Sequence, residues 1–405
     1  MKDTWRWLLL PLLAGCLCPW LARGQIDPVN RELFQFGYNG ALQGHPPLSA
    51  YAFYYRNQPN FLGTNWTLRL ALAPTYLDSE LGISHALGEH TDVGLGVAGG
   101  GFADSYYEIR QGQYLPKESF DGYGGLVSAS IYHLFNPGQQ IPLNGVLRGI
   151  AHYVTFDPTS DTAANFQVPK SMGVFSVRTG LRWGGREPTL YPDLAMELSI
   201  WYQGDFRTEA DTYGFGDRRV EAHSHLFWAQ ALLDYTLPNC KHTIYLSLVG
   251  GTSLDADRFS AYRLGALLPM AAEFPLSLPG YYFQELSADQ FVLFGGNYVV
   301  PLDKRRRWNL SVNAATAAVD YLPALEQPCN WNSGVGGGVF YTSPSWRVMV
   351  GYAYGVDAIR SSGRGAHSIG LLLQLDLTHA KEVFFRPEPT SPWRGFQRVI
   401  GVLGS

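Results

Sequence analysis

The residues of this chain that could do chemistry are charged and polar side chains recurring at every second position within apolar segments. In "HSIGLLLQLDL", residues 367–377, Gln374 and Asp376 interrupt a run of leucines in this way. Successive side chains of an extended strand point to opposite faces, so such residues share one face. Eight residues are predicted to lie on a face that looks into an enclosed interior: Arg69, Arg178, Arg182, Glu197, Asp234, Arg347, Gln374 and Asp376.

Two kinds of chemistry fit this set of inward-facing side chains. They could line an aqueous path and bias which ions pass through it. They could instead pair as salt bridges that fill the interior and brace the wall. The sequence leaves both interpretations open.

Metal and enzymatic chemistry are not expected. His223 and His225 are spaced for one strand face, but no third ligand and no zinc-type Cys/His spacing is evident, so neither a metal nor a cofactor is predicted. A membrane phospholipase would need a serine and a histidine together on the lipid-facing rim. His85, His133 and His152 lack such a partner in recognisable sequence. We therefore do not predict an enzyme.

The N-terminus has the pattern of a secretory signal peptide. Lys2 and Arg6 precede an apolar stretch, and the small-residue site Ala22-Arg23-Gly24 follows it. We predict a signal peptide at 1–24. The alternative is a lipoprotein signal, which would leave Cys16 lipidated at the new N-terminus.

The composition indicates a surface that does not all face water. The 405 residues are 46% hydrophobic and only 16% charged, against about 25% in soluble domains. No run of 18 apolar residues follows the signal segment, which argues against spanning helices. A closed barrel is the other architecture that satisfies its own backbone hydrogen bonds in lipid. The formal net charge of −4 gives no indication of nucleic-acid binding.

The two-residue period recurs along the mature sequence. In "RWNLSVNAATAAVDY", residues 307–321, apolar side chains alternate with Asn309, Ser311 and Asn313. Such segments are at least as long as the roughly 9–11 residues of a tilted bilayer crossing. Sixteen strands are predicted, near 33–43, 51–57, 66–76, 79–88, 91–101, 122–135, 144–156, 171–184, 190–204, 223–237, 242–252, 290–301, 307–321, 333–342, 346–356 and 367–377.

The predicted connections alternate between short turns and long polar links. Outer-membrane barrels show this pattern, with turns at one rim and loops at the other. The turns include 136–142 and 303–306, and the longest link is 253–289. Cys240 and Cys329 fall in connections at opposite rims, so we expect no disulfide between them.

The predicted fold is all-β: a transmembrane antiparallel up-and-down barrel at 25–377, followed by a C-terminal tail at 378–405. A soluble β-sandwich is the alternative, because its inner face is equally apolar. The polar face of a sandwich should carry many lysines and glutamates. Here that face carries Ser, Asn, Gly and a few Arg, which favours the barrel.

The C-terminal hairpins resemble a known family. "GVGGGVFYTSPSWRVMVGYAYG", residues 334–355, resembles the penultimate hairpin of the bacterial surface antigen barrel, found in outer-membrane assembly factors of the BamA and TamA type. The matching residues are Gly334, Gly336 and Gly338, the turn Ser343-Pro344, and Tyr352-Ala353-Tyr354-Gly355. The segments 262–270 and 287–302 resemble the strand pair that flanks the family's long sixth outer loop.

The resemblance has departures at the tip of that loop. The family carries an Arg-Gly-Tyr/Phe tripeptide there, with the arginine held by acidic residues of the next two strands. This chain has Pro279-Gly280-Tyr281 at the corresponding place, with Asn297 and Asn313 in those strands. The joint loss is coherent, because a buried carboxylate without its cation is costly. The interval before the first strand also leaves no room for the family's periplasmic repeat domains.

The resemblance implies a barrel of the bacterial cell outer membrane that helps to insert or export protein. Its partners would be outer-membrane lipids and a client or accessory protein. The alternatives are a porin-like passive channel or a purely structural barrel. An assembly role predicts that the loop at 253–289 folds into the lumen and that the first and last strands pair weakly.

Overall fold

The computed structural model describes residues 26–139, 141–185, 195–268, 274–361 and 363–378. The predicted signal peptide at 1–24, with its rival lipidation site Cys16, lies outside the described residues. So does the predicted tail, apart from Thr378.

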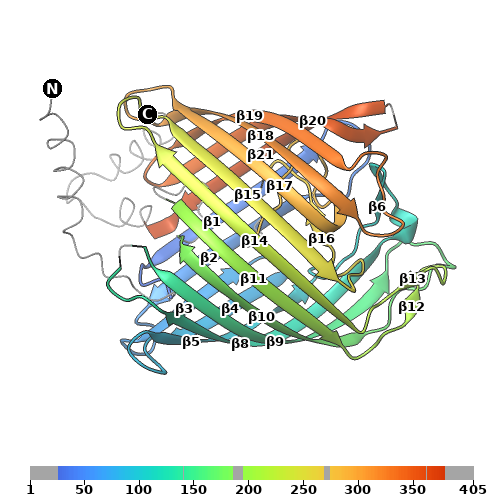
Figure 1. The fold of residues 1–405 in the computed structure, drawn as a ribbon, viewed down its shortest axis with the longest axis horizontal. Coiled ribbons are helices and arrows are strands. Elements are labelled where there is room, and N and C mark those ends of the chain that lie inside the picture. Colours follow the sequence, from blue (N-terminus) through green and yellow to red (C-terminus); the bar gives the residue numbers. More distant parts are fainter. Residues whose placement is uncertain (1–25, 140, 186–194, 269–273, 362, 379–405) are drawn as a thin grey trace, which may run out of the picture.

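The described residues form a closed antiparallel barrel of sixteen wall strands (Figure 1). Each wall strand pairs with its two neighbours, and β1 closes the wall by pairing with β21. The wall strands are β1 (Arg31–Ala41), β2 (Ala50–Pro59), β3 (Trp66–Leu72), β4 (Tyr76–Ile83), β5 (Thr91–Gly101), β8 (Phe120–Leu134), β9 (Leu143–Pro158), β10 (Met172–Gly184), β11 (Ala195–Arg207), β14 (His223–Thr236), β15 (Thr243–Leu254), β17 (Leu286–Pro301), β18 (Trp308–Tyr321), β19 (Trp331–Thr342), β20 (Trp346–Arg360) and β21 (Gly363–Asp376).

The two rims differ, as the lengths of the connections predicted. Short turns lie at the left rim of Figure 1, and the long loops lie at the right rim. These loops hold the small hairpins β6 (Ile109–Arg110) with β7 (Gln113–Tyr114) and β12 (Thr212–Tyr213) with β13 (Arg218–Arg219). They also hold the short helix η2 (Pro116–Glu118) and the strand β16 (Tyr262–Leu264), which pairs with β17.

The alternation in 367–377 separates an outer face from an inner one. Ile369, on the outer face, is 39% exposed, as an apolar side chain facing lipid should be. Leu372, on the other face, is only 1% exposed because it packs inside the barrel against Leu267 and Leu268. One closed wall surrounds this interior, so the sandwich alternative is wrong.

Several predicted strand boundaries differ from the structure, such as the starts of β17 at Leu286 and β21 at Gly363, and two of the differences have clear local reasons. The predicted strand at 66–76 ends at Leu72 because Pro74 lies in the turn between β3 and β4, which shifts β4 to 76–83. The predicted strand at 346–356 continues to Arg360 through an irregularity in register between Gly355 and Ile359. That irregularity breaks the two-residue period on which the prediction relied.

The remaining structural predictions concern helices and thiols. Among the described residues, no helix is long and apolar enough to cross a membrane. Cys240 and Cys329 are both free.

Candidate functional site: the loop inside the barrel

The loop between β15 and β17, described at residues 255–268 and 274–285, folds into the barrel. Leu264 and Leu278 are completely buried there. They belong to an apolar cluster with inward-facing residues of β17 and β18, including Phe291 and Val319. The first of the two features expected for an assembly role is therefore present. We call this loop the plug.

The plug begins at a buried ion pair. Nη1 of Arg207, at the end of β11, lies 2.9 Å from Oδ2 of Asp257, and both side chains are 4% exposed. The carboxylate also accepts hydrogen bonds from the backbone N–H groups of Glu221, Phe259 and Ser260. Several donors shared by one buried carboxylate fix where the loop leaves the wall.

The middle of the plug lies against the first and last strands. The N–H of Leu267 donates to Oδ1 of Asn39 on β1, at 3.0 Å. The Leu267 side chain lies against Gly351 on β20 and Gly370 on β21, where an added Cβ would come within 3.0 Å of it. The plug therefore contacts both sides of the β1–β21 seam.

A phenylalanine of the plug contacts the part of the wall opposite the seam. Trp201 on β11 and Trp228 on β14 are stacked with ring centroids 6.1 Å apart. The ring of Phe274 meets both edge-on, at 5.1 and 5.2 Å. Arg178 and Arg182 place their guanidinium groups over Trp228 and Trp201, at 6.0 and 5.5 Å from the ring centroids. Two of the predicted inward-facing arginines therefore support an anchor point for the plug.

The tripeptide Pro279-Gly280-Tyr281 lies at β19 and β20. Gly280 has φ +86° and packs so closely on β20 that an added Cβ would lie 1.8 Å from the backbone nitrogen of Gly355. The hydroxyl of Tyr281 donates to Oδ1 of Asn332 on β19, at 3.3 Å. These contacts involve the fourteenth and fifteenth wall strands, whereas Asn297 and Asn313 face each other on the twelfth and thirteenth.

A buried ion pair locks the end of the plug. Arg360 on β20 donates from Nη1 and Nη2 to the two carboxylate oxygens of Glu285, at 2.7 and 2.9 Å, and both side chains are 1% exposed. The same carboxylate accepts the N–H of Tyr282 at 2.7 Å. The Tyr282 ring lies 3.7 Å from the Arg360 guanidinium carbon, and its hydroxyl donates to the carbonyl of Gln43 beyond β1.

This lock reverses the charges that the family resemblance implies. The family places the arginine on the loop and the acids on the wall, whereas here Glu285 lies in the loop and Arg360 in the wall. The sequence analysis missed this pair. The residues are 75 positions apart, and Arg360 lay beyond the predicted end of its strand.

The other predicted inward-facing charges mostly form pairs along the wall. Arg182 lies 3.4 Å from Glu197, and Arg178 donates to the side-chain oxygen of Gln203 at 2.7 Å. Asp234 on β14 is 2% exposed. Such pairs could brace the wall, as one of the two interpretations supposed.

Three further predicted residues lie near the seam, towards the rim with short turns. Arg347 on β20 is the register partner of Gln374 on β21, which is itself paired with Gln35 on β1. Asp376 lies opposite Leu33 across the seam, and its N–H donates to the carbonyl of Ser345.

Glu80 on β4 is the centre of a polar cluster that the sequence analysis found only in part. Its carboxylate accepts hydrogen bonds from the predicted Arg69 at 3.2 Å, from Arg148 at 3.0 Å and from the Tyr132 hydroxyl at 2.7 Å. Two-residue alternation in β4 and β9 could have identified Glu80 and Arg148. The predicted strand at 79–88 obscured that pattern, because it started three residues too late.

The long loops pack together over the outer end of the interior. Glu108, which is completely buried, is surrounded by Arg110, Arg218 and Arg258 at 3.3, 3.6 and 3.2 Å. The Tyr106 hydroxyl donates to it at 2.6 Å. Burial raises the pKa of Tyr106, so the hydroxyl stays protonated and remains a donor. We call this set of loop residues the cap.

The second expected feature, weak pairing of the first and last strands, is not observed. The β1–β21 ladder runs over nine residue pairs, from Leu33–Asp376 to Ala41–Ser368. The β2–β3 ladder has six pairs and the β3–β4 ladder has seven. The seam is therefore longer than these two ladders and than the eight-pair β1–β2 ladder, but shorter than the twelve-pair β20–β21 ladder.

The histidines that were considered as ligands have other partners. His223 lies 3.9 Å from Asp255, and His225 shares a hydrogen bond with the Tyr202 hydroxyl at 2.9 Å. His152 lies 3.3 Å from Asp104. Within the described residues, no group of three or more His, Cys, Asp or Glu side chains is arranged to hold a metal ion.

Comparison with known proteins shows likeness at the level of structure. No family model and no curated protein matches the sequence. CdiB from Acinetobacter baumannii superposes with a TM-score of 0.59 and 12% identity, over 86% of this chain and 60% of that one. CdiB from Escherichia coli gives 0.56 and 11%, over 86% and 64%.

BamA from Haemophilus ducreyi, in a structure lacking POTRA domains 1-3, gives a TM-score of 0.54 and 10% identity, over 92% of this chain and 79% of that one. The present chain spans less than two thirds of either CdiB chain. Identities this low show the fold alone. The chain is a transmembrane barrel with the architecture of CdiB and BamA, as its resemblance to the surface antigen barrel predicted.

Proposed function

We propose that this protein is an outer-membrane barrel that inserts or exports a client protein, with the plug as its resting closure. The observation that carries the proposal is the position of the plug across the seam. It binds Asn39 and Gln43 on the β1 side and Arg360 on the β20 side. A client that displaced the plug would open the interior and release both sides of the seam together.

The length of the seam favours export through the interior over insertion through the wall. Opening the wall at β1–β21 would break a ladder of nine pairs. Moving the part of the plug that lies across the seam breaks the buried Glu285–Arg360 pair, a few hydrogen bonds and apolar contacts. The boundaries that we propose are a signal peptide at 1–24, the barrel at 25–377 and a tail at 378–405.

Purified barrel in lipid vesicles would test the proposal. The probe is a urea-unfolded eight-stranded barrel protein, whose folding into vesicles is read by heat-modifiable gel migration. Its transfer into the vesicle interior is read by protease protection. We expect the protein to accelerate one of these processes over empty vesicles. In a Cys240→Ser/Cys329→Ser background, a short thiol cross-linker between Leu267→Cys and Gly370→Cys should abolish the acceleration, because a Cβ added at Gly370 would lie 3.0 Å from the Leu267 side chain.

The alternatives predict different results. A porin-like channel would show steady conductance in a planar bilayer without any client, and the cross-link would reduce it. A structural barrel would show neither conductance nor acceleration. Acceleration that persists with the plug cross-linked would refute the role given to the plug.

A further inference from the structure

The turn between β17 and β18, residues 302–307, carries a run of cations at the rim with short turns. They are Lys304, Arg305, Arg306 and Arg307, of which the first three are exposed. The one acid of the turn is Asp303. Its two carboxylate oxygens accept the backbone N–H groups of Arg305 and Trp308, at 3.1 and 2.8 Å. Asp303 therefore fixes the backbone of the turn and leaves the three cations facing outward.

The neighbouring turn between β14 and β15, residues 237–242, adds another exposed cation, Lys241. Thr243 at the start of β15 pairs with Val299 near the end of β17, so the two turns lie side by side. The other short turns that the structure describes carry no Lys or Arg; they are 60–65, 84–90, 135–142 and 343–345. The cations of the described turns are therefore gathered at one place on the rim. We call Lys241, Lys304, Arg305 and Arg306 the basic patch.

Two cations of the basic patch occupy backbone positions that favour glycine. Arg306 has φ +53° and Lys241 has φ +61°, both in the left-handed region. A turn residue in this region is usually Gly, Asn or Asp. Strained positions of this kind gather where a side chain serves a function. Both turns therefore hold a long cation at a position where glycine would be free of strain.

Aromatic side chains place the basic patch at the surface of the membrane. Trp308, the first residue of β18, is 51% exposed, and Tyr298 on β17 is 40% exposed. The Tyr298 hydroxyl shares a hydrogen bond with Nδ1 of His242 in the neighbouring turn. Exposed Trp and Tyr at the strand ends of a barrel mark the level of the lipid headgroups. The basic patch therefore lies beside the headgroups of the leaflet next to the short turns.

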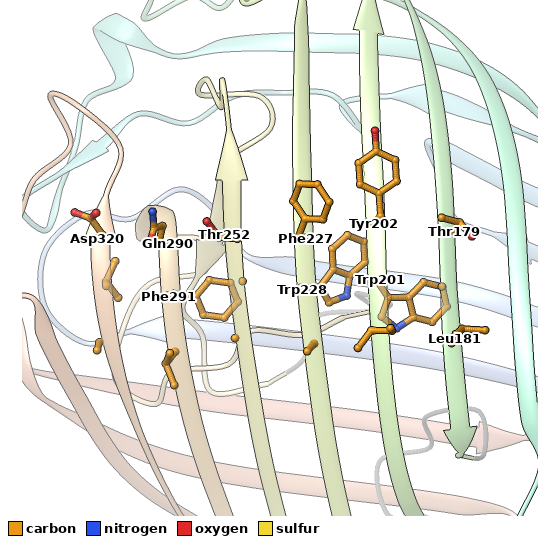
Figure 2. Close-up of a pocket in the computed structure, with 18 of the residues that line it drawn as sticks. Thr179, Leu181, Trp201, Tyr202, Phe227, Trp228, Thr252, Gln290, Phe291 and Asp320 are labelled. Carbon is orange, nitrogen blue, oxygen red and sulfur yellow. The ribbon is translucent and has the colours of Figure 1, made fainter.

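The wall beyond this level has no such charge. The four strands that the two turns join, β14, β15, β17 and β18, contain no Lys or Arg. A hollow on the outer face of these strands is lined by side chains such as Tyr202 and Phe227 (Figure 2). No Lys, Arg or His is among its lining residues. On this part of the outside of the barrel, positive charge is therefore confined to the headgroup level.

We propose that the basic patch binds the phosphate of a lipid with a net negative headgroup, such as phosphatidylglycerol. In an outer membrane this lipid belongs to the periplasmic leaflet, because the short turns of such barrels lie on that side. The guanidinium groups of Arg305 and Arg306 and the ammonium groups of Lys241 and Lys304 donate to its phosphate oxygens. A zwitterionic headgroup binds less well, because its own cation meets the same positive charge. An acidic protein is less well placed, because the patch adjoins aromatic side chains that face the membrane.

Native mass spectrometry of the detergent-purified barrel tests the proposal, with phosphatidylglycerol and phosphatidylcholine supplied in equal amounts. We expect the native protein to retain phosphatidylglycerol preferentially. Lys304→Gln/Arg305→Gln should reduce this preference by roughly fivefold for each cation removed. Lys170→Gln/Arg219→Gln is the matched control, because it removes two exposed cations from the long loops at the other rim. Equal preference in the two double variants would overturn the proposal.

Arg306→Gly separates the charge of this residue from its effect on the backbone. Glycine adopts φ +53° without strain, so the variant should unfold at the same or a higher temperature than the native protein in the same detergent. Its preference for phosphatidylglycerol should fall. An unchanged preference would overturn the role given to Arg306, whatever the unfolding temperature.

Two further probes identify the source of the bound charge. Sodium phosphate at the same concentration as the lipid should not displace phosphatidylglycerol from the native protein. Displacement would show that the patch binds free phosphate and would overturn the assignment to a lipid. A polyglutamate peptide that binds in place of phosphatidylglycerol would indicate an acidic protein partner and would overturn it as well.

Discussion

At the scale of single residues, the Glu285–Arg360 pair decides whether the plug stays in place. Both side chains are almost completely buried, and the carboxylate satisfies the two guanidinium nitrogens and the Tyr282 N–H together. A pair of this kind need not add stability compared with an apolar pair. Losing one partner is costly, however, because it leaves an uncompensated buried charge.

Glu285→Ala should therefore release the plug. It leaves the Arg360 guanidinium buried without its carboxylate, at a cost of roughly 3–5 kcal/mol, and the measurement is single-channel conductance in a planar bilayer. We expect higher conductance or more frequent opening than in the native protein. Glu285→Ala/Arg360→Ala should open less than the single variant, because it leaves no lone charge. Equal conductance of native and single-variant protein would contradict the lock.

Gly280→Ala should dislodge the tip of the plug by a different route. An added Cβ would lie 1.8 Å from the backbone nitrogen of Gly355, so the tip must move away from β20. Gly216→Ala is the matched control, because its φ of +84° is close to the +86° of Gly280 and nothing lies within 4 Å of an added Cβ. Faster proteolysis of the plug in Gly280→Ala alone would confirm the contact. Equal cleavage in both would assign the effect to backbone strain.

The sequence predicted which face of a strand a residue occupies better than it predicted which residues that side chain contacts. Alternation placed Arg178, Arg182 and Glu197 on the inner face without any knowledge of the loop. It gave no sign that Phe274 lies against the tryptophans beneath two of those arginines. A face follows from local backbone geometry, whereas a partner depends on the path of a loop that has no repeating pattern.

At the scale of elements, β3 and β4 are the shortest strands of the wall. These strands have seven and eight residues, and the ladder between β2 and β3 has six pairs. The ladder between β20 and β21 has twelve. A shorter ladder exposes more of its backbone hydrogen bonds to end fraying.

Hydrogen exchange should reflect this difference. We expect the backbone amides of β2–β3 to exchange faster than those of β20–β21, measured by mass spectrometry on the barrel in lipid nanodiscs. The seam amides of β1 and β21 should be intermediate. Faster exchange at the seam than at β2–β3 would show that β1–β21 is the weak ladder after all, and would support insertion through the wall.

The elements were largely predictable because each wall strand meets two different environments. Lipid on one side and a closed interior on the other enforce the two-residue period over most of the chain. Prediction failed where that constraint lapsed. Examples are the turn at Pro74, the irregularity between Gly355 and Ile359, and the plug, whose apolar residues follow no period.

At the scale of the whole molecule, the wall and the plug are separable systems. Every wall strand is paired on both sides, whereas the plug is held by the three-residue β16–β17 ladder, buried ion pairs and apolar contacts. The folded protein should therefore run faster than the boiled protein on a detergent gel. Glu285→Ala should keep that shift, because it weakens the plug and leaves the ladders intact. Mobility that boiling does not change, in a protein that stays in the soluble fraction, would contradict the barrel.

Closure of the wall determines the order in which the barrel can be completed during folding. The N–H of Glu32 and the hydroxyl of Thr378 meet across the seam, 346 positions apart. Until the last strand is in place, the incomplete sheet has two unpaired edge strands. Each of them can pair with another polypeptide chain. Biogenesis must therefore keep the first strand sheltered through nearly the entire synthesis, and a truncation near the C-terminus would be far more damaging than one of equal size within a loop.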